Sequence, residues 1–291
     1  MTVDKQGEFD LSESAKLKEM FDLTGKVAVI TGGAGLLGSK HAEALAELGA
    51  TTVLLDIDQV RCDAVAKQVS KMFGVESIGV CADITDLGQI EDLNKMLIEK
   101  YGRIDILINN AANNPAVGAK GLDGLHSSRL EAFSMQTWHD DIAVGLTGAF
   151  LCARVFGGQM AQSGGGVILN IASDLAVIAP DQRLYRKDDV EEQSQPVKPV
   201  TYSVVKSGLV GLTKYLATYW AEQGVRCNAL SPGGVYVDQD DVFLSRISKL
   251  IPMGRMANKD EYKGVIAFLA SDASSYMNGT NLVVDGGRSV W

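Results

Sequence analysis

The chain has 291 residues, of which 46% are hydrophobic and 22% are charged, and its net charge is −9. This is the composition of a globular protein, and the acidic balance disfavours nucleic acid and anionic membranes as partners. No apolar run approaches the ~18–20 residues that span a bilayer, and the N-terminus lacks the basic start and apolar core of a secretory signal. We therefore expect a cytoplasmic protein with four reduced cysteines and no metal site.

A strand, a glycine-rich turn and a helix follow one another near the start of the chain. Val27–Ile30 is a short apolar run, typical of a strand buried on both faces of a parallel sheet. The turn TGGAGLLG (residues 31–38) and a helix-like stretch over Lys40–Leu48 come next. The glycines allow a tight turn and a close approach to a pyrophosphate, which the free N–H groups of the helix would face. The pattern predicts a dinucleotide site rather than a turn that serves packing alone.

A carboxylate at the end of the next strand bears on the choice of dinucleotide. The strand Thr52–Leu55 ends at Asp56, where a carboxylate accepts hydrogen bonds from an adenosine ribose. The same charge repels the 2′-phosphate of NADP, and no arginine stands beside it in the sequence. Lys40 is a candidate counter-charge, but it is set back on the helix. We therefore expect NAD to be preferred over NADP.

Strands and helices alternate along the rest of the chain. Further strands are predicted over residues 77–81, 104–108, 167–171, 225–230 and 281–284, and further helices over residues 61–72, 87–101, 138–154, 202–223 and 261–269. Such alternation predicts an α/β fold with a doubly wound, seven-stranded parallel sheet flanked by helices. Ligands bind such sheets at the carboxyl ends of the strands, where Asp83 and Asn110 fall. Residues 1–22 are interpreted as an N-terminal arm on a single domain formed by residues 23–291.

Tyr202 and Lys206 lie four residues apart in a segment predicted to be helical, so they share one helix face. A phenol with a pKa of about 10 is a poor acid–base catalyst near neutrality, whereas a nearby ammonium favours the phenolate and lowers that pKa. The spacing fits a catalytic pair, although it is also common on ordinary helix surfaces.

Eight motifs, taken in order, carry a resemblance to a known family. They are TGGAGLLG (31–38), Asp56, Ala82-Asp83, NNAA (109–112), LNIAS (169–173), YSVVK (202–206), CNALSPGG (227–234) and VVDGG (283–287). From about Leu23 to Gly287 the chain resembles the short-chain dehydrogenase/reductase family, in its dehydrogenase-type branch. The resemblance implies a single Rossmann-like domain.

The resemblance also implies roles for particular residues. Tyr202 would be the general acid/base for a carbonyl or alcohol oxygen, Ser173 would hydrogen-bond the same oxygen, and Lys206 would lower the pKa of Tyr202 and bind the nicotinamide ribose. The hydride would pass between the substrate carbon and the nicotinamide. The implied cofactor-binding residues are Gly32, Gly35, Leu36, Leu37, Gly38, Asp56, Asp83, Ile84, Asn110, Ala111, Tyr202, Lys206, Pro232, Gly233 and Val235. In the family, two of the helices and the VDGG end form subunit contacts, which implies a homodimer or homotetramer.

Three substitutions depart from the family pattern. Leu36 stands where a glycine is usual, a spacing closer to the extended, sugar-nucleotide branch, and Val237 replaces a threonine that contacts the carboxamide. Gly145 aligns with the asparagine that completes the catalytic tetrad. A backbone carbonyl or another side chain, such as Asn113 or Asn114, would then have to order the water near the lysine.

A fourth departure is an insertion over residues 181–198, which is polar, rich in prolines at its edges and expected near the active site. We interpret it as a lid or a subunit contact. Its Arg183, Arg186 and Lys187 could meet a phosphate or carboxylate of the substrate. Alternatively, they pair with the acidic residues of the same loop, which are Asp188, Asp189, Glu191 and Glu192.

The combined pattern predicts an NAD(P)-dependent oxidoreductase that interconverts an alcohol and a ketone on a small polar substrate, such as a sugar, polyol or sugar derivative. Two alternatives remain at this point. The glycine spacing suggests a nucleotide-sugar epimerase or dehydratase, and Gly145 suggests an NAD-binding regulatory protein without turnover.

Overall fold

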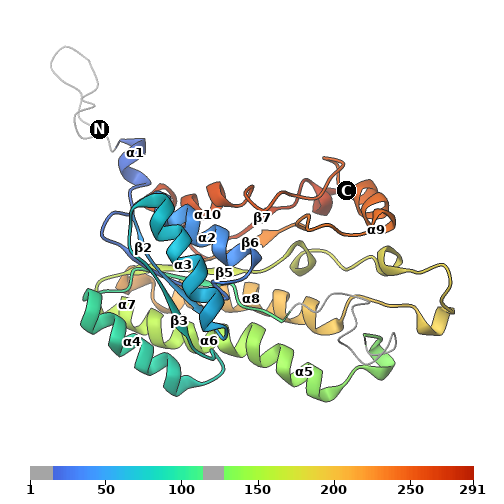
Figure 1. Ribbon diagram of the computed structural model, residues 1–291, viewed down its shortest axis with the longest axis horizontal. Helices are drawn as coiled ribbons and strands as arrows, with labels where there is room; N and C mark the ends of the chain where they lie inside the picture. The colour runs from blue at the N-terminus through green and yellow to red at the C-terminus, as the bar shows by residue number, and fades with distance from the viewer. Residues whose placement is uncertain (1–15, 114–127) are drawn as a thin grey trace, which may run out of the picture.

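The computed structural model describes residues 16–113 and 128–291. At its centre is a parallel sheet with the strand order β3-β2-β1-β4-β5-β6-β7 (Figure 1). The strands are β1 (Val27–Thr31), β2 (Thr51–Asp56), β3 (Ser77–Cys81), β4 (Ile106–Asn109), β5 (Gly166–Ile171), β6 (Val225–Pro232) and β7 (Asn281–Val284). The chain winds outward from β1 in both directions, as a doubly wound sheet does. The predicted α/β fold with seven parallel strands is confirmed.

Helices cover both faces of this sheet (Figure 1). They are α1 (Leu17–Met20), α2 (Leu36–Glu47), α3 (Gln59–Phe73), α4 (Leu87–Tyr101), α5 (Met135–Ile142), α6 (Gly148–Cys152), α7 (Gly158–Gln162), α8 (Val200–Tyr219), α9 (Asp241–Ile247) and α10 (Lys263–Ala270). Because side chains alternate along a strand, Ala28 and Ile30 of β1 join the core beneath α2, α3 and α10. Val27 and Val29 join the core beneath α4, α6, α7 and α8. Burial on both faces explains why the strands are continuous apolar runs.

Capping residues fix the ends of the two helices that follow β2 and β3. The side chain of Asp58 accepts a hydrogen bond from the N–H of Arg61 and starts α3, which ends at Gly74 with φ +71°. Asp86 starts α4 in the same way, and Gly102 ends it with φ +74°. An acidic N-cap and a left-handed glycine are the usual helix boundary residues, so both helices lie within two residues of their predicted ranges.

The helix predicted over residues 138–154 is longer than expected and irregular. Ser134 caps its start, and the helical run continues through α5, α6 and α7 to Gln162 with two π-helical turns, Ala143–Thr147 and Ala153–Gly157. The glycines near its end do not break the run, because the space beside Gly157 is filled by Trp220 and Ile168.

This run also corrects the expectation about apolar segments. By length and composition alone, Met135–Gln162 is apolar enough to cross a membrane. In the fold it is a core helix, since Cys152, Phe156 and Met160 are fully buried against the sheet. Core helices of globular domains pass the same compositional test, because burial on one face selects the same residues.

Candidate active site

A cleft of about 900 Å³ opens at the carboxyl ends of the strands. Its walls come from the turns after β1, β2, β4, β5 and β6 together with the start of α8 and the segment around α9. Every residue predicted from the sequence to bind the cofactor or to act in catalysis lines this cleft except Gly38, which lies beneath the glycine turn. The edge of the sheet thus brings together side chains that are far apart in the sequence.

The glycine turn is fixed by two backbone requirements. Gly32 has φ +61°, a conformation that favours glycine. A Cβ at Gly38 would lie 2.1 Å from the carbonyl oxygen of Gly32, so the helix can approach the turn only without a side chain there. Leu36, at the position of a usual family glycine, is 45% exposed and lies on the cleft wall. The turn therefore keeps a cradle for a pyrophosphate despite the substitution.

Asn110 holds the glycine turn in place. Its side-chain amide donates to the carbonyl oxygens of Thr31 (3.0 Å) and Gly32 (3.2 Å). The hydroxyl of Thr31 in turn accepts hydrogen bonds from the backbone N–H groups of Asn110 and Ala111. Asn110 thus joins the ends of β1 and β4 at the start of the glycine turn, which is part of the predicted cofactor site.

The neighbouring Asn109 has a structural part. Its amide donates to Asn170 on β5 (2.8 Å), and Asn170 donates to the hydroxyl of Thr213 on α8 (2.8 Å). All three side chains are buried. This amide ladder ties β4 and β5 to α8.

Asp56 occupies the predicted place at the end of β2, but its surroundings differ from the expectation. One carboxylate oxygen accepts from the N–H of Ala34 in the glycine turn (3.2 Å) and the other from the N–H of Ile57 (2.9 Å). The guanidinium of Arg61, on α3, donates to the carbonyl oxygen of the same Ala34 (3.0 Å). Arg61 and Asp56 thus contact the same residue of the glycine turn, Ala34, and the sequence did not indicate this arginine.

Two further cofactor positions are held by local turns. The carboxylate of Asp83 accepts from the N–H and hydroxyl of Thr85. Gly233 donates its N–H to Val284 of β7 and accepts a hydrogen bond from the hydroxyl of Tyr262, which fixes the loop after β6. Both turns therefore present rigid backbone to the cleft.

Ser173, Tyr202 and Lys206 converge on one side of the cleft. Ser173 follows β5, and Tyr202 and Lys206 lie on the first two turns of α8. Lys206 is 5% exposed, its ammonium donates to the carbonyl oxygen of Ile171 (2.7 Å), and it lies 5.9 Å from the centroid of the Tyr202 ring. The three residues that the family pattern identifies are thus assembled in the folded chain.

The pKa of Tyr202 does not follow the expectation. Burial raises the pKa of Tyr202, the hydrogen bond with Ser173 lowers it, and the negative charge of Asp174 raises it further. The pKa of Lys206 is itself lowered to about 8 by burial and by the positive charge of Lys198. The ammonium of Lys206 donates to the carbonyl oxygen of Ile171, and the direction of the Tyr202 shift follows from burial, Ser173 and Asp174.

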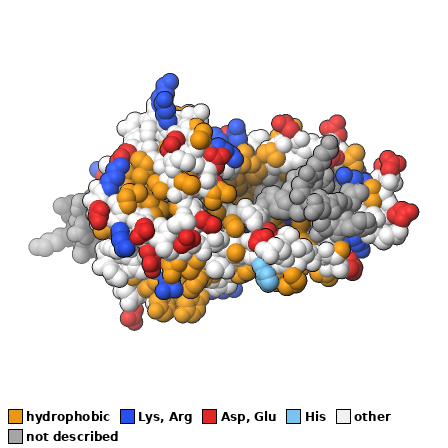
Figure 2. All heavy atoms as spheres, turned by 60° about the horizontal axis from the view of Figure 1, so that its bottom comes forward, with side chains coloured by type: hydrophobic (Ala, Val, Ile, Leu, Met, Phe, Trp, Pro, Cys, Tyr) orange, Lys and Arg blue, Asp and Glu red, His pale blue; other side chains and the backbone are white. Residues whose placement is uncertain are grey.

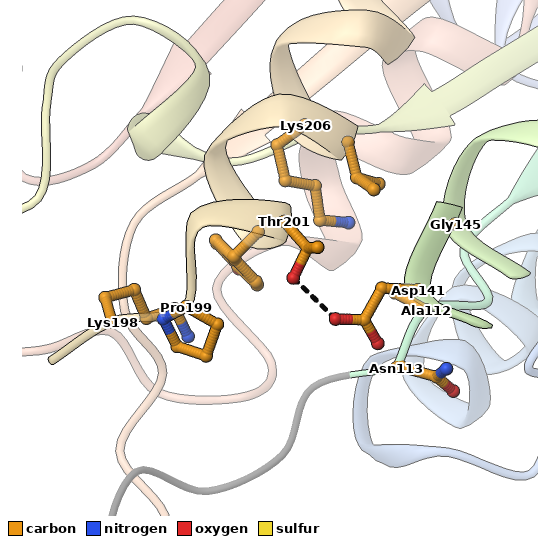
Figure 3. A pocket seen from close by; sticks show the side chains of 10 residues that line it. Ala112, Asn113, Asp141, Gly145, Lys198, Pro199, Thr201 and Lys206 are labelled. Atoms are coloured by element: carbon orange, nitrogen blue, oxygen red, sulfur yellow. Dashed lines mark hydrogen bonds between the residues drawn. The ribbon is translucent and has the colours of Figure 1, made fainter. Parts of the chain in front are cut away.

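The position of the usual asparagine is closed by packing. A Cβ at Gly145 would lie 2.5 Å from a γ-methyl of Val205. Beside Gly145 is a cavity of about 10 Å³, the size of about one water molecule, lined by Asn113, Asp141, Tyr202 and Lys206 among others (Figure 3). The carboxylate of Asp141 faces into it and accepts a hydrogen bond from the hydroxyl of Thr201 (Figure 3).

Asp141 is therefore a polar group that the sequence pattern did not predict for this place. Asn113 also lines the cavity, and its side chain donates to the backbone oxygen of Asp140 (3.4 Å). The other asparagine considered, Asn114, lies outside the described residues.

Three charged residues in the cleft were not predicted from the sequence. Asp174 directly follows Ser173, Arg288 follows the VDGG end, and Lys198 ends the insertion; all three line the cleft. Lys198 lies 3.8 Å from the centroid of the Tyr202 ring, and burial lowers the pKa of Lys198 to about 8. Asp174 could have been suspected from the sequence, because it directly follows Ser173. No neighbouring motif residue indicates that Arg288 or Lys198 lies in the cleft.

The insertion folds into a roof over the substrate side of the cleft. Leu184 is 5% exposed and packs with Ile247, Ile251 and Met256 around α9. The ring of Tyr185 lies 5.8 Å from that of Phe243. This small core places apolar side chains opposite Ser173 and Tyr202 in the same cleft.

The basic residues of the insertion form ion pairs within the protein. Arg183 pairs with Asp181 (2.7 Å), and Arg186 pairs with Glu192 (2.6 Å). Both pairs are exposed, so they contribute little to stability. The pairing interpretation of Arg186 is confirmed, while Arg183 pairs with an aspartate outside the set considered.

The arrangement can carry out proton transfer beside a bound dinucleotide. The cleft holds the hydroxyl of Ser173, the phenol of Tyr202 and the ammonium of Lys206. The glycine turn and the carboxylate of Asp56 line the same cleft. Among residues 16–113 and 128–291, no group of three His, Cys, Asp or Glu side chains is placed to hold a metal ion.

The chain is similar in sequence and in structure to known proteins. Residues 26–185 match the family model described as short chain dehydrogenase, and residues 189–289 match that described as Enoyl-(Acyl carrier protein) reductase. The chain is 34% identical over 287 residues to the D-threitol dehydrogenase of Mycolicibacterium smegmatis, which covers 96% of this chain and 100% of that protein. It is 33% identical over 275 residues to the NAD-dependent glycerol dehydrogenase of Listeria innocua, with 93% and 96% covered. A solved gluconate 5-dehydrogenase from Burkholderia cenocepacia, in complex with NADP and tartrate, has a TM-score of 0.81 at 28% identity and covers 95% of this chain and 100% of its own.

Proposed function

Since the chain belongs to the short-chain dehydrogenase/reductase family, we propose that it oxidises a secondary alcohol of a small polyol or sugar with NAD, and reduces the matching ketone in reverse. The chain is an NAD(P)-dependent oxidoreductase acting on CH–OH groups. The observation that carries the substrate class is the polar lining of the cleft, where Lys198 and Gln239 line the same space as Ser173 and Tyr202. Hydroxyl-rich substrates need such donors and acceptors.

The catalytic residues divide the work around one oxygen. When bound, a nicotinamide cofactor supplies the hydride acceptor. Tyr202 takes the proton of the substrate hydroxyl in oxidation and returns it in reduction, while Ser173 hydrogen-bonds the same oxygen. Lys206, on the second turn of α8, would hold the cofactor ribose. The chain fits such a cofactor, because Gly32 and Gly38 leave room for its pyrophosphate and Asp56 ends the next strand.

The preference for NAD rests on Asp56. Its carboxylate lies at the end of β2 on the cleft wall, where it would repel a 2′-phosphate. Arg61 moderates this preference, since its guanidinium lies on the glycine turn beside Asp56. A minor activity with NADP is therefore part of the proposal.

We further propose that the chain acts as a homodimer or homotetramer in the cytoplasm. Phe150 on α6 and Val204, Tyr215 and Tyr219 on α8 are between 38% and 62% exposed. Figure 2 shows patches of hydrophobic side chains on the face that carries the lower helices of Figure 1. Apolar helix faces of this kind are typical of subunit interfaces. The four cysteines are free, as a reducing compartment requires.

The two alternative functions are not favoured. The relatives are named as dehydrogenases of small polyols rather than as epimerases or dehydratases of nucleotide sugars. A regulatory protein without turnover does not need Ser173, Tyr202 and Lys206 together in one cleft.

The proposal is tested by following NADH absorbance with a panel of glycerol, tetritols, pentitols, hexitols and gluconate, with NAD and NADP in parallel. We expect NAD-dependent oxidation of at least one polyol, and a loss of about 10²–10⁴-fold in kcat for Tyr202→Phe. Tyr219→Phe, a substitution on the exposed part of the same helix, is the matched control. Full activity of Tyr202→Phe, or no activity of the wild type on the whole panel, would contradict the proposal.

A further inference from the structure

A buried chain of hydrogen bonds joins the catalytic serine to the C-terminal end of the protein. The hydroxyl of Ser173 donates to one carboxylate oxygen of Asp174 (2.8 Å), which also accepts from the N–H of Leu175 (2.8 Å). The other carboxylate oxygen accepts from the guanidinium of Arg288 (2.7 Å). The side chains of Arg288 and Asp174 are 9% and 4% exposed, so this pair is shielded from water.

Arg288 is held rigidly although it lies three residues from the chain's last residue. The carboxylate of Asp285 accepts hydrogen bonds from the N–H groups of Gly287 (2.9 Å) and Ser289 (2.8 Å), which closes a turn around Arg288. Gly287 has φ +89° and packs on Pro252. The indole N–H of Trp291 donates to the carbonyl oxygen of Leu250 (3.0 Å). The guanidinium therefore reaches Asp174 from a fixed position.

The direction of the Ser173 hydroxyl follows from this geometry. A serine has one proton to donate and two lone pairs that accept. Because the hydroxyl of Ser173 donates to Asp174 (2.8 Å) and accepts from the N–H of Leu175 (3.2 Å), two hydrogen bonds hold its oxygen in place at the cleft.

The charges around Tyr202 come from several elements. Asp174 lies on the turn after β5, Arg288 on the C-terminal turn, Lys198 before α8 and Lys206 on α8. Tyr185 of the insertion interacts electrostatically with Tyr202, and Asp141 of α5 lines the small cavity that Tyr202 also borders. Within this set, Asp174 and Arg288 are paired with each other, so a change in either one alters the net charge beside the phenol.

We propose that Asp174 and Arg288 are positioning residues for the catalytic pair: Asp174 anchors the Ser173 oxygen, and Arg288 balances the negative charge that Asp174 places beside Tyr202. This inference rests on the proposed role of Tyr202 as the base in alcohol oxidation. A negative charge near a phenol favours its protonated form, and a neighbouring cation offsets that effect. The pair would thus keep the phenol able to lose its proton while the serine stays oriented.

The charge-balancing half is tested by the pH dependence of kcat/KM for polyol oxidation at saturating NAD. In Arg288→Gln the charge of Asp174 is no longer balanced, so the midpoint should move to higher pH by roughly half a unit, which lowers activity on the acid limb about threefold. In Asp174→Asn the guanidinium is left alone, so the midpoint should move to lower pH by a similar amount. Arg288→Lys, which keeps the charge, should retain the wild-type midpoint. If these single variants lose activity but their pH midpoints do not move in opposite directions, the charge-balancing role of Arg288 is wrong.

Loss of one partner of a buried ion pair is strongly destabilising, so two double variants provide a second test that buries no lone charge. Asp174→Asn with Arg288→Gln keeps an acceptor for the Ser173 proton, whereas Asp174→Leu with Arg288→Met removes it. Both should keep the wild-type midpoint, but the apolar pair should be at least tenfold slower in kcat with NAD affinity unchanged. Equal rates in the two double variants would overturn the orienting half.

Tyr202→Phe separates this inference from the proposed function. If Tyr202→Phe is inactive and the variants of Asp174 and Arg288 show no shifts, the positioning role alone is wrong. If Tyr202→Phe keeps full activity, the mechanism on which the inference rests is wrong. Thermal unfolding and NAD binding, measured by protein fluorescence, confirm that each variant is folded.

Discussion

The cofactor side and the substrate side of the cleft are built in different ways. On the cofactor side, side chain-to-backbone hydrogen bonds join Asp56 and Asn110 to the glycine turn at the ends of adjacent strands. On the substrate side, the insertion, α9 and the C-terminal turn meet through a small apolar core and buried charges. The first side is built from strand ends and a glycine turn, and the second from loops and a short helix. The two sides should therefore respond differently to substitution.

The largest effect is expected on NAD affinity, for a substitution in the glycine turn where the backbone leaves no room for a side chain. In Gly38→Ala the new methyl group would lie 2.1 Å from the carbonyl oxygen of Gly32, and backbone cannot move aside as a side chain can. We expect NAD affinity to fall by more than about 100-fold, measured by fluorescence titration, because a misplacement of the turn removes contacts to the pyrophosphate.

Gly158→Ala is the matched control for this substitution. Gly158 lies on α7, and no atom is within 4 Å of a Cβ built there. Alanine in a helix is favoured over glycine by roughly 0.5–1 kcal/mol, so this variant should bind NAD normally and unfold at an equal or higher temperature. Equal NAD affinity in both variants would show that the turn is not a rigid cradle.

The next effect concerns the selectivity of the cofactor side. In Asp56→Ser the carboxylate is lost while a hydroxyl remains to accept the N–H of Ala34, and Arg61 stays beside the turn. We expect the ratio of kcat/KM for NAD to that for NADP to fall by about 10–100-fold, which corresponds to roughly 1.4–2.8 kcal/mol. An unchanged ratio would remove Asp56 as the determinant of cofactor choice.

On the substrate side, truncation of the roof should affect substrate more than cofactor. Leu184→Ala opens a space between the insertion and α9, where Leu184 packs with Ile247 and Met256. We expect KM for the polyol to rise several-fold to about tenfold with NAD affinity unchanged, since the roof positions substrate only.

Leu54→Ala on the cofactor side is the comparison for the roof variant. Leu54 is fully buried at the centre of β2, so its truncation should lower the free energy of unfolding by about 2–5 kcal/mol. A loss of this size for Leu184→Ala, detected by denaturant unfolding, would mean that the roof is part of the main core.

The smallest expected effect is a change in the free energy of unfolding, and it follows from the buried ammonium of Lys198. Burial lowers the pKa of Lys198 to about 8 from 10.5, so the unfolded chain binds the proton more tightly than the folded chain. The charged form therefore destabilises the fold below about pH 8, and this cost is relieved as the pH rises from about 8 to 10.5. Lys198→Met should thus stabilise the protein at pH 7 by roughly 1–2 kcal/mol.

The pH dependence separates this effect from a general gain in packing. The gain from Lys198→Met should shrink between pH 8 and 10, whereas Lys187→Met, at an exposed lysine of the same insertion, should change little at any pH. Calorimetric unfolding at pH 7 and pH 9.5 measures both. A gain that is independent of pH would show that Lys198 is not destabilised by burial.

The two sides also differ in how far the sequence predicted them. Gly32, Asp56, Ser173 and Tyr202 could be predicted because each belongs to a short motif at the end of a strand or on a helix. Asp174 carried only a local hint, the neighbouring Ser173.

Arg288 and Lys198 could not be predicted, because their positions depend on how the C-terminal turn and the insertion fold back over the sheet. The direction of the pKa shift of Tyr202 could not be predicted from the sequence either. It depends on burial, on the hydrogen bond with Ser173 and on the charge of Asp174, none of which a four-residue spacing reveals.

The contact between Gly145 and Val205 has a consequence for the history of the active site. A Cβ at position 145 would lie 2.5 Å from a γ-methyl of Val205, and the β-branched valine has little rotamer freedom in a helix to avoid it. A mutation that introduces asparagine at 145 is therefore disfavoured until 205 becomes smaller, whereas a smaller residue at 205 is tolerated in either background. The order of the two mutations is thus constrained. Reversion to the common family arrangement would require the packing residue to change before the polar one.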